Sequence, residues 1–256
     1  MDLSGTSAIV SGGASGLGLA AATRLHAAGA EVVVLDRPDD ASSTRAQQVA
    51  AIGERAHFVG GDVTDPSAAA AAVEAATDRA PLRAAVSCAG VASPGKLVGR
   101  RGALDSETFM HVLAVNTGGT MNLMAHAAEA MQANELRGED RGVLINTASI
   151  AAFEGQIGQI AYSASKGAVA SMTLPAAREL AATQIRVVTI APGLFETPMM
   201  AGLPEEARTS LAEKTPHPAR LGRPEDYALT VEQILTNPML NGEVIRLDGA
   251  VRMEPR

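Results

Sequence analysis

Tyr162 and Lys166 stand four residues apart in the segment AYSASKGAV, in a chain of 256 residues that has only two tyrosines and three lysines. Residues at positions i and i+4 share one face of a helix, so the two side chains can point the same way. Such a pair often only covers a helix surface. It can also perform acid–base chemistry, because a nearby ammonium group makes a phenol more acidic.

Hydride removal from a secondary alcohol requires a base for the hydroxyl proton, and a phenolate can serve only if it forms near neutral pH. The pKa of free tyrosine is about 10. An ammonium about 4 Å away, at an effective dielectric constant of about 20, supplies on the order of 4 kcal/mol, which corresponds to about three pKa units. We therefore expect Lys166 to lower the pKa of Tyr162 into the working range, with the charge of an oxidised nicotinamide adding to the effect.

Ser149 precedes Tyr162 by 13 residues and lies at the end of a predicted strand. Its hydroxyl is suited to hold a substrate oxygen and the charge that develops on it. Each residue also has an ordinary structural interpretation, since Ser149 can cap a helix and Tyr162 can be a surface aromatic. The occurrence of Ser149, Tyr162 and Lys166 together favours a catalytic role over these structural interpretations.

Short β-branched runs alternate with longer alanine-rich segments along the chain. The predicted strands cover residues 7–12, 31–36, 56–63, 82–90, 142–149, 185–193 and 243–249. The predicted helices cover residues 17–28, 66–79, 105–134, 161–183 and 224–236. Several helices begin after good caps, such as Asp65 followed by Pro66, and Asp105. This alternation indicates a series of βαβ units.

The predicted strands are apolar without strict alternation, which is typical of a parallel sheet covered by helices on both faces. The sequence therefore predicts an α/β fold in a single domain, residues 1–256, with a doubly wound Rossmann-type sheet of about seven parallel strands. Two irregular segments, 91–104 and 193–223, follow strand ends, where the ligands of such sheets bind.

The first predicted strand runs into SGGASGLGLAAA, which places Gly12, Gly16 and Gly18 at a strand-to-helix turn in the spacing GxxxGxG. Glycine permits a tight turn and close backbone approach, while a helix N-terminus offers free N–H groups and a positive dipole end. A glycine-rich turn alone is often only a loop. In this βαβ context it predicts a site for the pyrophosphate of a dinucleotide.

Asp36 ends the second predicted strand, 24 residues after Gly12. A carboxylate there can accept hydrogen bonds from the adenosine ribose and repel a 2′-phosphate, which favours NAD over NADP. The alternative interpretation of Asp36 is a helix cap or loop charge. Arg37 leaves NADP open, because a guanidinium at that position can hold a 2′-phosphate.

The composition excludes several partner classes. The net charge of −7 and isoelectric point near 5.3 give no basic footprint for nucleic acid. The apolar runs are shorter than the roughly 20 residues that span a bilayer. We therefore expect neither nucleic-acid nor membrane partners. The start MDLSGTSAIV has no basic region or arginine-rich presequence, so we expect a cytoplasmic protein. The single cysteine, Cys88, has no basic sequence neighbour and is expected to pack rather than react.

Several motifs together identify a resemblance to a family. They are GxxxGxG at 12–18, Asp62, Ala89–Gly90, Asn116, Ser149, Tyr162-x3-Lys166 and Pro192–Gly193. This set resembles the short-chain dehydrogenases/reductases over essentially the whole chain. Two departures are SCAG at 87–90 for the commoner NNAG or NCAG, and VNTGGTMN at 115–122 for VNLxGTxN. Both leave Asn116 in place.

Three segments of the C-terminal half carry a closer resemblance within that family. They are INTASIAAFEGQIGQIAYSASKG, APGLFETPMM and NGEVIRLDGAVRMEP. They look like the type II 3-hydroxyacyl-CoA dehydrogenases, also called 17β-hydroxysteroid dehydrogenases type 10. This resemblance implies NAD-dependent interconversion of 3-hydroxyacyl-CoA and 3-oxoacyl-CoA, with tyrosine as the general acid/base.

The family resemblance assigns roles to particular residues. The implied catalytic residues are Ser149, Tyr162, Lys166 and Asn116, the last anchoring a water relay to Lys166. The implied cofactor-binding residues are Gly12, Ser15, Gly16, Leu17, Gly18, Asp36, Asp62, Val63, Cys88, Ala89, Gly90, Tyr162, Lys166, Phe195 and Thr197. Phe195 and Thr197 would lie over the nicotinamide. Ser149, Gln159 and Tyr162 would contact the substrate, although Gln159 can equally be a solvated residue at a helix start. No metal is expected.

Three further inferences concern substrate and partners. Lys96, Arg100 and Arg101 in KLVGRRG could attract the phosphates of a CoA thioester, or could belong to an ordinary solvated loop. The alternative functions are a dehydrogenase for hydroxysteroids or other secondary alcohols, and a dinucleotide-binding scaffold without turnover. The helices at 105–134 and 161–183 form the subunit contacts in the family, so the resemblance implies a homotetramer.

Overall fold

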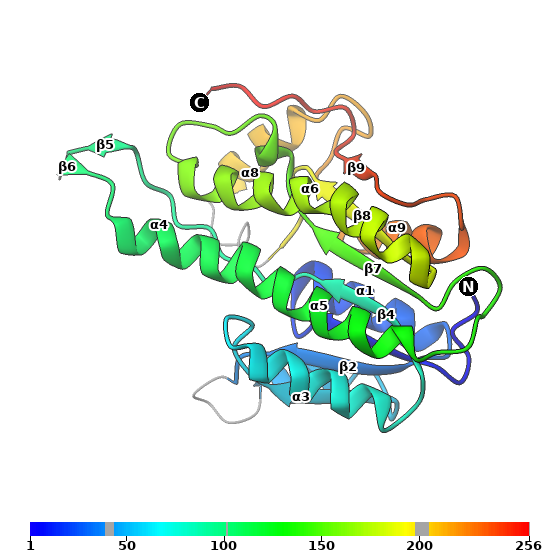
Figure 1. Cartoon of the computed structure of the whole chain (residues 1–256). Helices are drawn as coiled ribbons and strands as arrows, with labels where there is room; N and C mark the ends of the chain where they lie inside the picture. Colours follow the sequence, from blue (N-terminus) through cyan, green and yellow to red (C-terminus); the bar gives the residue numbers. More distant parts are fainter. Residues whose placement is uncertain (39–43, 101, 198–204, 256) are drawn as a thin grey trace.

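The computed structural model of the chain describes residues 1–38, 44–100, 102–197 and 205–255. Its centre is a seven-stranded sheet with the order β3-β2-β1-β4-β7-β8-β9, in which all neighbours pair in parallel (Figure 1). The strands are β1 (Ser7–Ser11), β2 (Glu31–Asp36), β3 (Ala56–Gly60), β4 (Leu82–Ser87), β7 (Gly142–Thr147), β8 (Ile185–Pro192) and β9 (Val244–Leu247). The predicted fold class is confirmed, and each predicted strand is present.

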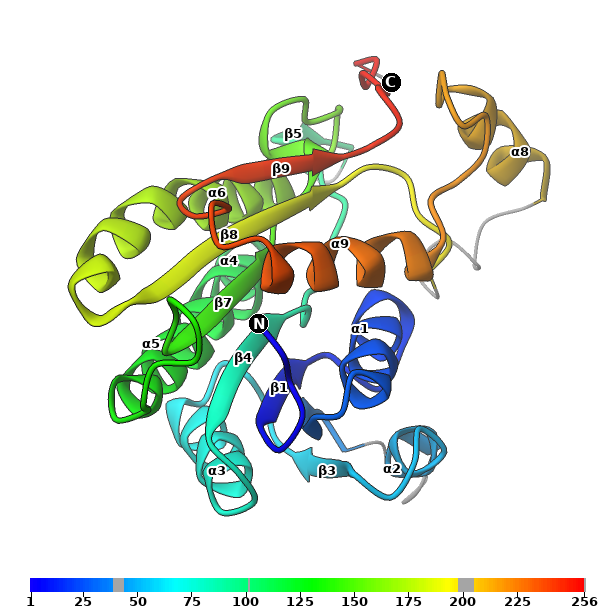
Figure 2. The same ribbon diagram turned by 90° about the vertical axis from the view of Figure 1, so that its right-hand side faces the viewer.

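Helices cover both faces of this sheet (Figure 2). Helices α3 (Pro66–Thr77), α5 (Gly119–Gln132) and α6 (Ile160–Leu180) lie on one face, and α1 (Gly16–Ala27), α2 (Thr44–Ala50) and α9 (Pro224–Thr236) lie on the other. Each face has its own apolar core, and the central strands β1, β4, β7 and β8 are buried along their whole length. Burial on both faces explains why these strands lack polar alternation.

The helix starts that the sequence predicts are present with their caps. The Asp65 carboxylate accepts a hydrogen bond from the N–H of Ser67 at 2.9 Å, with Pro66 in the first turn of α3. The Asp105 carboxylate accepts one from the N–H of Thr108 at 2.9 Å and caps α4 (Ser106–Leu113). These short acidic side chains satisfy N–H groups that have no partner within the helix.

The predicted helix at 105–134 is divided by a π-helical turn, Ala114–Gly118, between α4 and α5. Asn116 lies in this turn and is fully buried. A π-helical turn alters the i to i−4 hydrogen-bond pattern and often occurs at functional sites. The sequence prediction of one continuous helix over 105–134 did not include this turn.

Helices α2 and α8 and strands β5 and β6 were not predicted. Helix α2 buries only Val49, and α8 (Glu205–Glu213) is too polar to show an apolar stripe. Strands β5 (Val98–Gly99) and β6 (Gly102–Ala103) form a two-residue antiparallel hairpin in the segment 91–104, which was expected to be irregular. None of these four elements has the hydrophobic periodicity on which such predictions rest.

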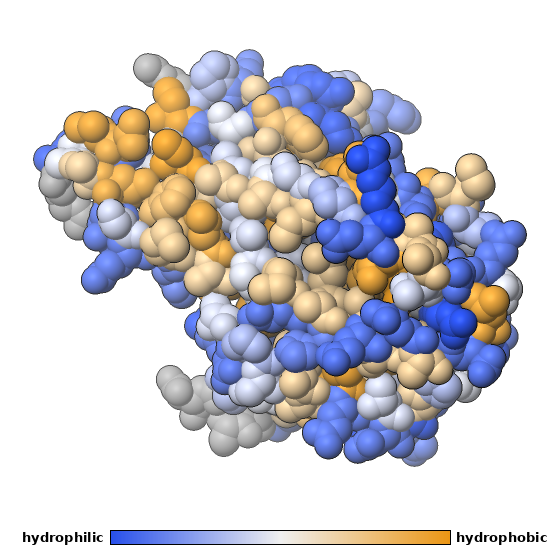
Figure 3. All heavy atoms as spheres, in the orientation of Figure 1, coloured by the Kyte–Doolittle hydropathy of each residue, from blue (hydrophilic) through white to orange (hydrophobic). Residues whose placement is uncertain are grey.

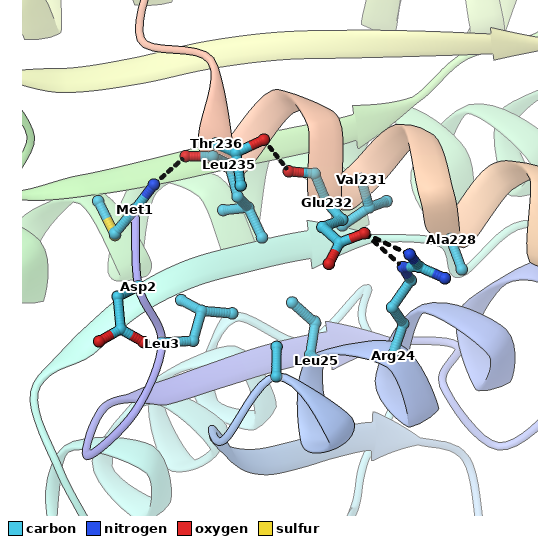
Figure 4. A pocket seen from close by; sticks show the side chains of 11 residues that line it. Met1, Asp2, Leu3, Arg24, Leu25, Ala228, Val231, Glu232, Leu235 and Thr236 are labelled. Carbon is cyan, nitrogen blue, oxygen red and sulfur yellow. Dashed lines mark hydrogen bonds and ion pairs between the residues drawn. The ribbon is translucent and has the colours of Figure 1, made fainter.

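Helices α1 and α9 pack side by side, and the first residues of the chain reach their ends (Figure 4). Arg24 of α1 forms an ion pair with Glu232 of α9. The amino group of Met1 donates a hydrogen bond to the carbonyl oxygen of Leu235 at 2.6 Å. These residues border a small pocket of about 200 Å³ that contains none of the predicted site residues. No helix within the described ranges has the length and apolar character needed to cross a membrane.

Candidate active site

The glycine turn after β1 lies directly against the end of β4. Gly12 has φ of +67°, and a Cβ atom there would lie 2.7 Å from backbone atoms of Ala89. A Cβ atom on Gly18 would overlap the carbonyl oxygen of Gly12. A side chain is therefore excluded at both positions, which explains the glycines. The strand order reverses between β1 and β4, so this turn stands at the crevice where doubly wound sheets bind ligands.

The N-terminus of α1 opens from the same turn. Its N-cap residue, Ser15, is extended at φ −156° and makes no side-chain hydrogen bond to the helix. Helices α3 and α4 differ in this respect, because Asp65 and Asp105 cap them. The first N–H groups of α1, beginning at Gly16 and Leu17, therefore receive no acceptor from Ser15, and the helix dipole adds positive potential there. These features fit a dinucleotide pyrophosphate.

Asp36 connects the glycine turn to the end of β2. Its carboxylate accepts hydrogen bonds from the N–H of Ala14 at 3.1 Å and the N–H of Arg37 at 2.8 Å. The guanidinium of Arg45, on α2, also donates to it. Asp36 thus holds negative charge beside the glycine turn, as the sequence predicts for a ribose-binding carboxylate. Arg45 is a second cation at this position, and sequence reasoning did not single it out.

The residues after β3 lie next to this region. Asp62 is exposed, and its carboxylate accepts hydrogen bonds from the N–H and the hydroxyl of Thr64. These hydrogen bonds, led by the one from the backbone N–H, hold the pKa of Asp62 below its usual range. Val63 is buried, and its carbonyl oxygen accepts a hydrogen bond from the Asn122 amide at 2.9 Å. The carboxylate of Asp62 therefore faces solvent at the carboxyl edge, while Val63 belongs to the core.

Cys88, Ala89 and Gly90 continue β4 beneath the catalytic residues. Burial raises the pKa of the Cys88 thiol, which agrees with a packing role rather than a nucleophilic one. A Cβ atom on Gly90 would lie 3.1 Å from Oδ1 of Asn116 and 3.5 Å from Nζ of Lys166. Gly90 therefore allows these two side chains to approach the end of β4.

Asn116 joins the loop after β4 to helix α6. Its Oδ1 accepts a hydrogen bond from the N–H of Val91 at 2.8 Å, and its Nδ2 donates to the carbonyl oxygen of Val91 at 2.9 Å. The same Nδ2 donates to Oγ of Ser165 at 2.9 Å. The Asn116 side chain is thus engaged in fixing the backbone, and both it and Lys166 lie beside Gly90. The expected water relay to Lys166 remains a prediction.

Ser149 and Tyr162 come together at the carboxyl edge. Ser149 follows β7, and its Oγ accepts a hydrogen bond from the N–H of Ala151 at 3.1 Å, which caps a short 3₁₀ turn (Ile150–Ala152). Tyr162 lies in the first turn of α6. Burial raises the pKa of Tyr162, and a hydrogen bond with the Ser149 hydroxyl lowers it by less. Ser149 is therefore a helix cap and also a neighbour of the phenol.

Lys166 lies one turn after Tyr162 on α6 and is only 4% exposed. Its Nζ is 5.9 Å from the centroid of the Tyr162 ring and donates a hydrogen bond to the carbonyl oxygen of Thr147 at 2.7 Å. Burial lowers the pKa of Lys166 from 10.5 to about 8, and only an ionised Cys88 nearby would oppose this, in part. The predicted proximity of the two side chains is therefore present.

The expected lowering of the Tyr162 pKa by Lys166 is not found, because the pKa of Tyr162 is raised. The ammonium is directed to the carbonyl of Thr147, and it is itself desolvated, so burial dominates the titration of both groups. An ammonium about 4 Å away at an effective dielectric constant of about 20 would lower the pKa of Tyr162, but the cost of burying the charged phenolate outweighs this effect.

Three other predicted contacts are placed as follows. The ring of Phe195 is 6% exposed and packs in the core against Gly222, and its contact with a nicotinamide remains a prediction. Thr197 is half-buried in the following loop. Oε1 of Gln159 accepts a hydrogen bond from the N–H of Gln156 at 2.9 Å, which supports its alternative interpretation as a helix-entry residue.

An exposed apolar groove of about 620 Å³ lies beside the first turn of α6. Its walls come from residues 95–98 and from the segment between Ser149 and Tyr162. Leu97 and Val98 are 64% and 73% exposed, and Phe153 and Ile157 are each 53% exposed. Apolar side chains gather on the projecting arm that carries β5 and β6 (Figure 3). Lys96 and Arg100 are exposed on this arm, whereas Arg101 lies outside the described residues.

Sequence reasoning missed three polar residues around Lys166. Ser165 donates a hydrogen bond from Oγ to the carbonyl oxygen of Tyr162 at 2.7 Å and accepts the one from Asn116. Thr147 provides the carbonyl for Lys166, and Tyr227 bonds to the hydroxyl of Thr147. Ser165 could have been noticed within the Tyr162–Lys166 turn. Tyr227 gives no such signal, because it comes from α9, far along the chain. Across the described ranges, no cluster of three His, Cys, Asp or Glu side chains could hold a metal ion.

Comparisons with known proteins agree with this geometry. The sequence profile of a family described as short chain dehydrogenase matches residues 6–208. The chain is 49% identical over 255 residues to the 3-hydroxyacyl-CoA dehydrogenase type-2 of Homo sapiens, covering 98% of this chain and 97% of that protein. It is 49% identical over 251 residues to the protein of the same name from Drosophila melanogaster, covering 96% and 97% of the two chains.

Solved structures give the same result. The crystal structure of 3-hydroxyacyl-CoA dehydrogenase type-2 from Mycobacterium avium has a TM-score of 0.93 and 44% identity, and the match covers 98% of both chains. A 3-ketoacyl-(acyl-carrier-protein) reductase from Brucella melitensis, complexed with NADH, has a TM-score of 0.84 and 28% identity, and the match covers 96% of this chain and 98% of that chain.

The buried ammonium of Lys166 should make stability depend on pH. Because its pKa falls from 10.5 to about 8 on folding, the unfolded chain binds the proton more tightly between these values, and stability rises with pH there. At about 1.4 kcal/mol per pH unit, the cost at pH 7 is about 3 kcal/mol. Lys166→Met removes this cost. The stability advantage of the variant over the parent should therefore shrink by about 3 kcal/mol between pH 7 and pH 10.5, as measured by urea unfolding. If the difference in unfolding free energy between Lys166→Met and the parent stays constant with pH, the lowered pKa of Lys166 is wrong.

Proposed function

The chain belongs to the short-chain dehydrogenase family, and from this premise we propose that it interconverts 3-hydroxyacyl-CoA and 3-oxoacyl-CoA with NAD. The observation that carries the proposal is the meeting of Ser149, Tyr162 and Lys166 beside the glycine turn. The phenol and its serine neighbour lie at the carboxyl edge of the sheet, and the only lysine of the core lies under them. A scaffold without turnover has no need for this combination.

In the proposed reaction Tyr162 accepts the hydroxyl proton of the substrate as a phenolate. Ser149 holds the substrate oxygen during the change from alcohol to carbonyl. When bound, oxidised NAD accepts the hydride and brings a positive charge close to the phenol. Lys166 supplies a second positive charge, and its two remaining N–H donors are available to cofactor or water. In the reverse direction Tyr162 returns the proton to the developing alkoxide.

The substrate assignment rests on the relatives. Proteins 49% identical over nearly the full chain bear the name 3-hydroxyacyl-CoA dehydrogenase type-2. The apolar groove beside α6 and the cations Lys96 and Arg100 are compatible with a thioester that has a long apolar part and phosphates. Hydroxysteroids and other apolar secondary alcohols remain the alternative, because the same proton-transfer residues serve them.

NAD is proposed over NADP because of Asp36. Its carboxylate carries negative charge where the adenosine ribose is expected, and a 2′-phosphate there would be repelled. The neighbouring Arg45 and Arg37 are the groups that could favour NADP if that charge were removed.

Two further proposals concern assembly and location. One is the homotetramer, in which the surfaces of α4, α5 and α6 would form subunit contacts. Met121 of α5 and Leu174 of α6 are 45% and 44% exposed, which is compatible with such contacts. The other is the cytoplasmic location.

Replacement of Tyr162 by phenylalanine should stop turnover and spare cofactor binding. The variant keeps the ring and loses only the proton acceptor, so kcat should fall by about 10³-fold or more. The assay is NADH absorbance after mixing with NAD and 3-hydroxybutyryl-CoA, and NADH binding is measured separately by fluorescence. Parent protein that turns over neither this thioester nor a panel of hydroxysteroids and secondary alcohols would support the scaffold alternative. Turnover of steroids alone would support the alternative substrate class.

Replacement of Asp36 by asparagine should weaken the preference for NAD. The amide keeps an acceptor for Ala14 but removes the charge, so the ratio of kcat/KM for NAD to that for NADP should fall by about 10- to 100-fold. Asp65→Asn is the matched control, because it removes an acidic charge from a nearby helix cap and asparagine caps helices equally well. Equal use of both cofactors by the parent would remove the NAD assignment.

Alanine at both Lys96 and Arg100 should raise KM for a CoA thioester selectively. If these exposed cations bind CoA phosphates, KM for acetoacetyl-CoA should rise by about three- to tenfold, while KM for a ketone without CoA stays constant. Arg79→Ala serves as control, because Arg79 is exposed just before β4, at the opposite edge of the sheet. Equal changes for both substrates would mean that the loop has no role in CoA binding.

A further inference from the structure

A buried polar cluster lies beneath Lys166 and takes no part in the proton transfer just described. It consists of Tyr227 from α9, Thr147 at the end of β7 and Cys88 after β4. The hydroxyl of Tyr227 is 2.7 Å from Oγ1 of Thr147 and 3.4 Å from Sγ of Cys88. Oγ1 of Thr147 also donates weakly to the same sulfur at 3.6 Å. Tyr227 is completely buried, and Thr147 is 7% exposed.

Thr147 connects this cluster to the catalytic lysine. Its side chain bonds to Tyr227, and its backbone carbonyl oxygen accepts the hydrogen bond from Nζ of Lys166 at 2.7 Å. The position of the ammonium therefore depends on the position of the Thr147 peptide. A hydrogen bond that fixes the Thr147 side chain also restricts that peptide, because both belong to one residue at the end of a strand.

Helix α9 is a firm support for the phenol of Tyr227. The residue lies in the first turn, directly after Asp226. The Asp226 carboxylate accepts hydrogen bonds from the N–H of Arg223 at 2.8 Å and from the guanidinium of Arg220 at 2.7 Å, so the helix start is fixed. The ring packs in the apolar core shared with α1. A phenylalanine would fill this space equally well, and only the bond to Thr147 and the contact with Cys88 require a hydroxyl.

The groups around Lys166 make the carbonyl of Thr147 its main hydrogen-bond partner. The titratable groups next to Lys166 are the Cys88 thiol and the Tyr162 phenol. Tyr227 is connected to Lys166 only through Thr147. Burial raises the pKa of each of these three groups, so all are neutral near pH 7. Lys166 makes no ion pair with a carboxylate of the described residues. The ammonium is therefore held chiefly by the Thr147 carbonyl.

We propose that Tyr227 is a positioning residue for catalysis: its hydroxyl fixes Thr147, and Thr147 in turn holds the ammonium of Lys166 beside Tyr162. This role rests on the dehydrogenase chemistry proposed above. Tyr227 itself touches neither substrate nor reacting atoms. Its loss should reduce the stabilisation of the charged form of Lys166 and leave the substrate-binding surface intact.

The kinetic test compares Tyr227→Phe with a matched control. The variant should lower kcat for 3-hydroxybutyryl-CoA by about tenfold, the usual value of one buried hydrogen bond, with little change in KM. Thr189→Val is the control, because Thr189 is buried on β8 and its hydroxyl bonds to the hydroxyl of Thr173 at 2.6 Å and not to Thr147 or Lys166. It should leave kcat within about twofold. Equal losses in the two variants would reduce Tyr227 to a structural role and overturn the proposal.

A double-variant cycle asks whether the effect passes through Lys166. In a Lys166→Met background, Tyr227→Phe should cause no further loss of the residual activity. A loss that persists at full size in that background overturns the proposal. Thr147→Val should reproduce the loss seen in Tyr227→Phe, and Thr147→Ser should restore activity because it keeps the hydroxyl. This pair also gives the test if Tyr227→Phe fails to fold.

A final measurement needs no substrate. The pH-dependent difference in stability between a protein and its Lys166→Met counterpart reports the pKa of Lys166. In the Tyr227→Phe background the midpoint of this step should move about half to one pH unit lower, while Thr189→Val should not move it. An unchanged midpoint overturns the proposal whatever the kinetics. If the parent lacks dehydrogenase activity, the proposed function fails, and this midpoint still decides whether Tyr227 supports Lys166.

Discussion

Burial of a single ammonium group governs this site. Lys166 is almost without solvent, lacks a carboxylate partner among the described residues, and has a pKa lowered to about 8. An unpaired buried charge is costly, so the fold must supply compensating dipoles and rigid neighbours. The carbonyl of Thr147, the absence of a side chain at Gly90 and the fixed start of α9 are parts of that support. The remaining architecture holds this lysine beside a phenol and a dinucleotide turn.

The parallel sheet makes the arrangement possible because every strand ends at the same edge. The glycine turn follows β1, the small residues 88–90 follow β4, and Ser149 follows β7. Segments that are far apart in sequence therefore meet without long loops. Close approach then requires particular residues: Gly12 at the contact with Ala89, and Asn116 in a π-helical turn that joins the loop after β4 to α6. The fold brings the strand ends to one edge of the sheet, and these local features allow the segments there to contact one another.

Burial acts against the charged forms of both Tyr162 and Lys166, since it raises the pKa of the phenol and lowers the pKa of the ammonium. A positive charge from an oxidised nicotinamide would oppose the first effect, so the chemistry and cofactor binding are linked through electrostatics. Because these groups are desolvated, surrounding dipoles such as the Thr147 carbonyl matter more here than they would in water.

The sequence by itself determined the βαβ order, the glycine turn, Asp36 and the Tyr162–Lys166 pair, because each depends on local spacing or on hydrophobic pattern. The tertiary structure alone decided which groups surround Lys166. Tyr227 and Thr147 are 80 residues apart and meet only after α9 packs on the sheet. Burial changed the expected titration of Tyr162, and packing against Gly222 placed the Phe195 ring in the core. Desolvation and contacts between distant segments exist only in the folded chain, so local sequence patterns do not predict them.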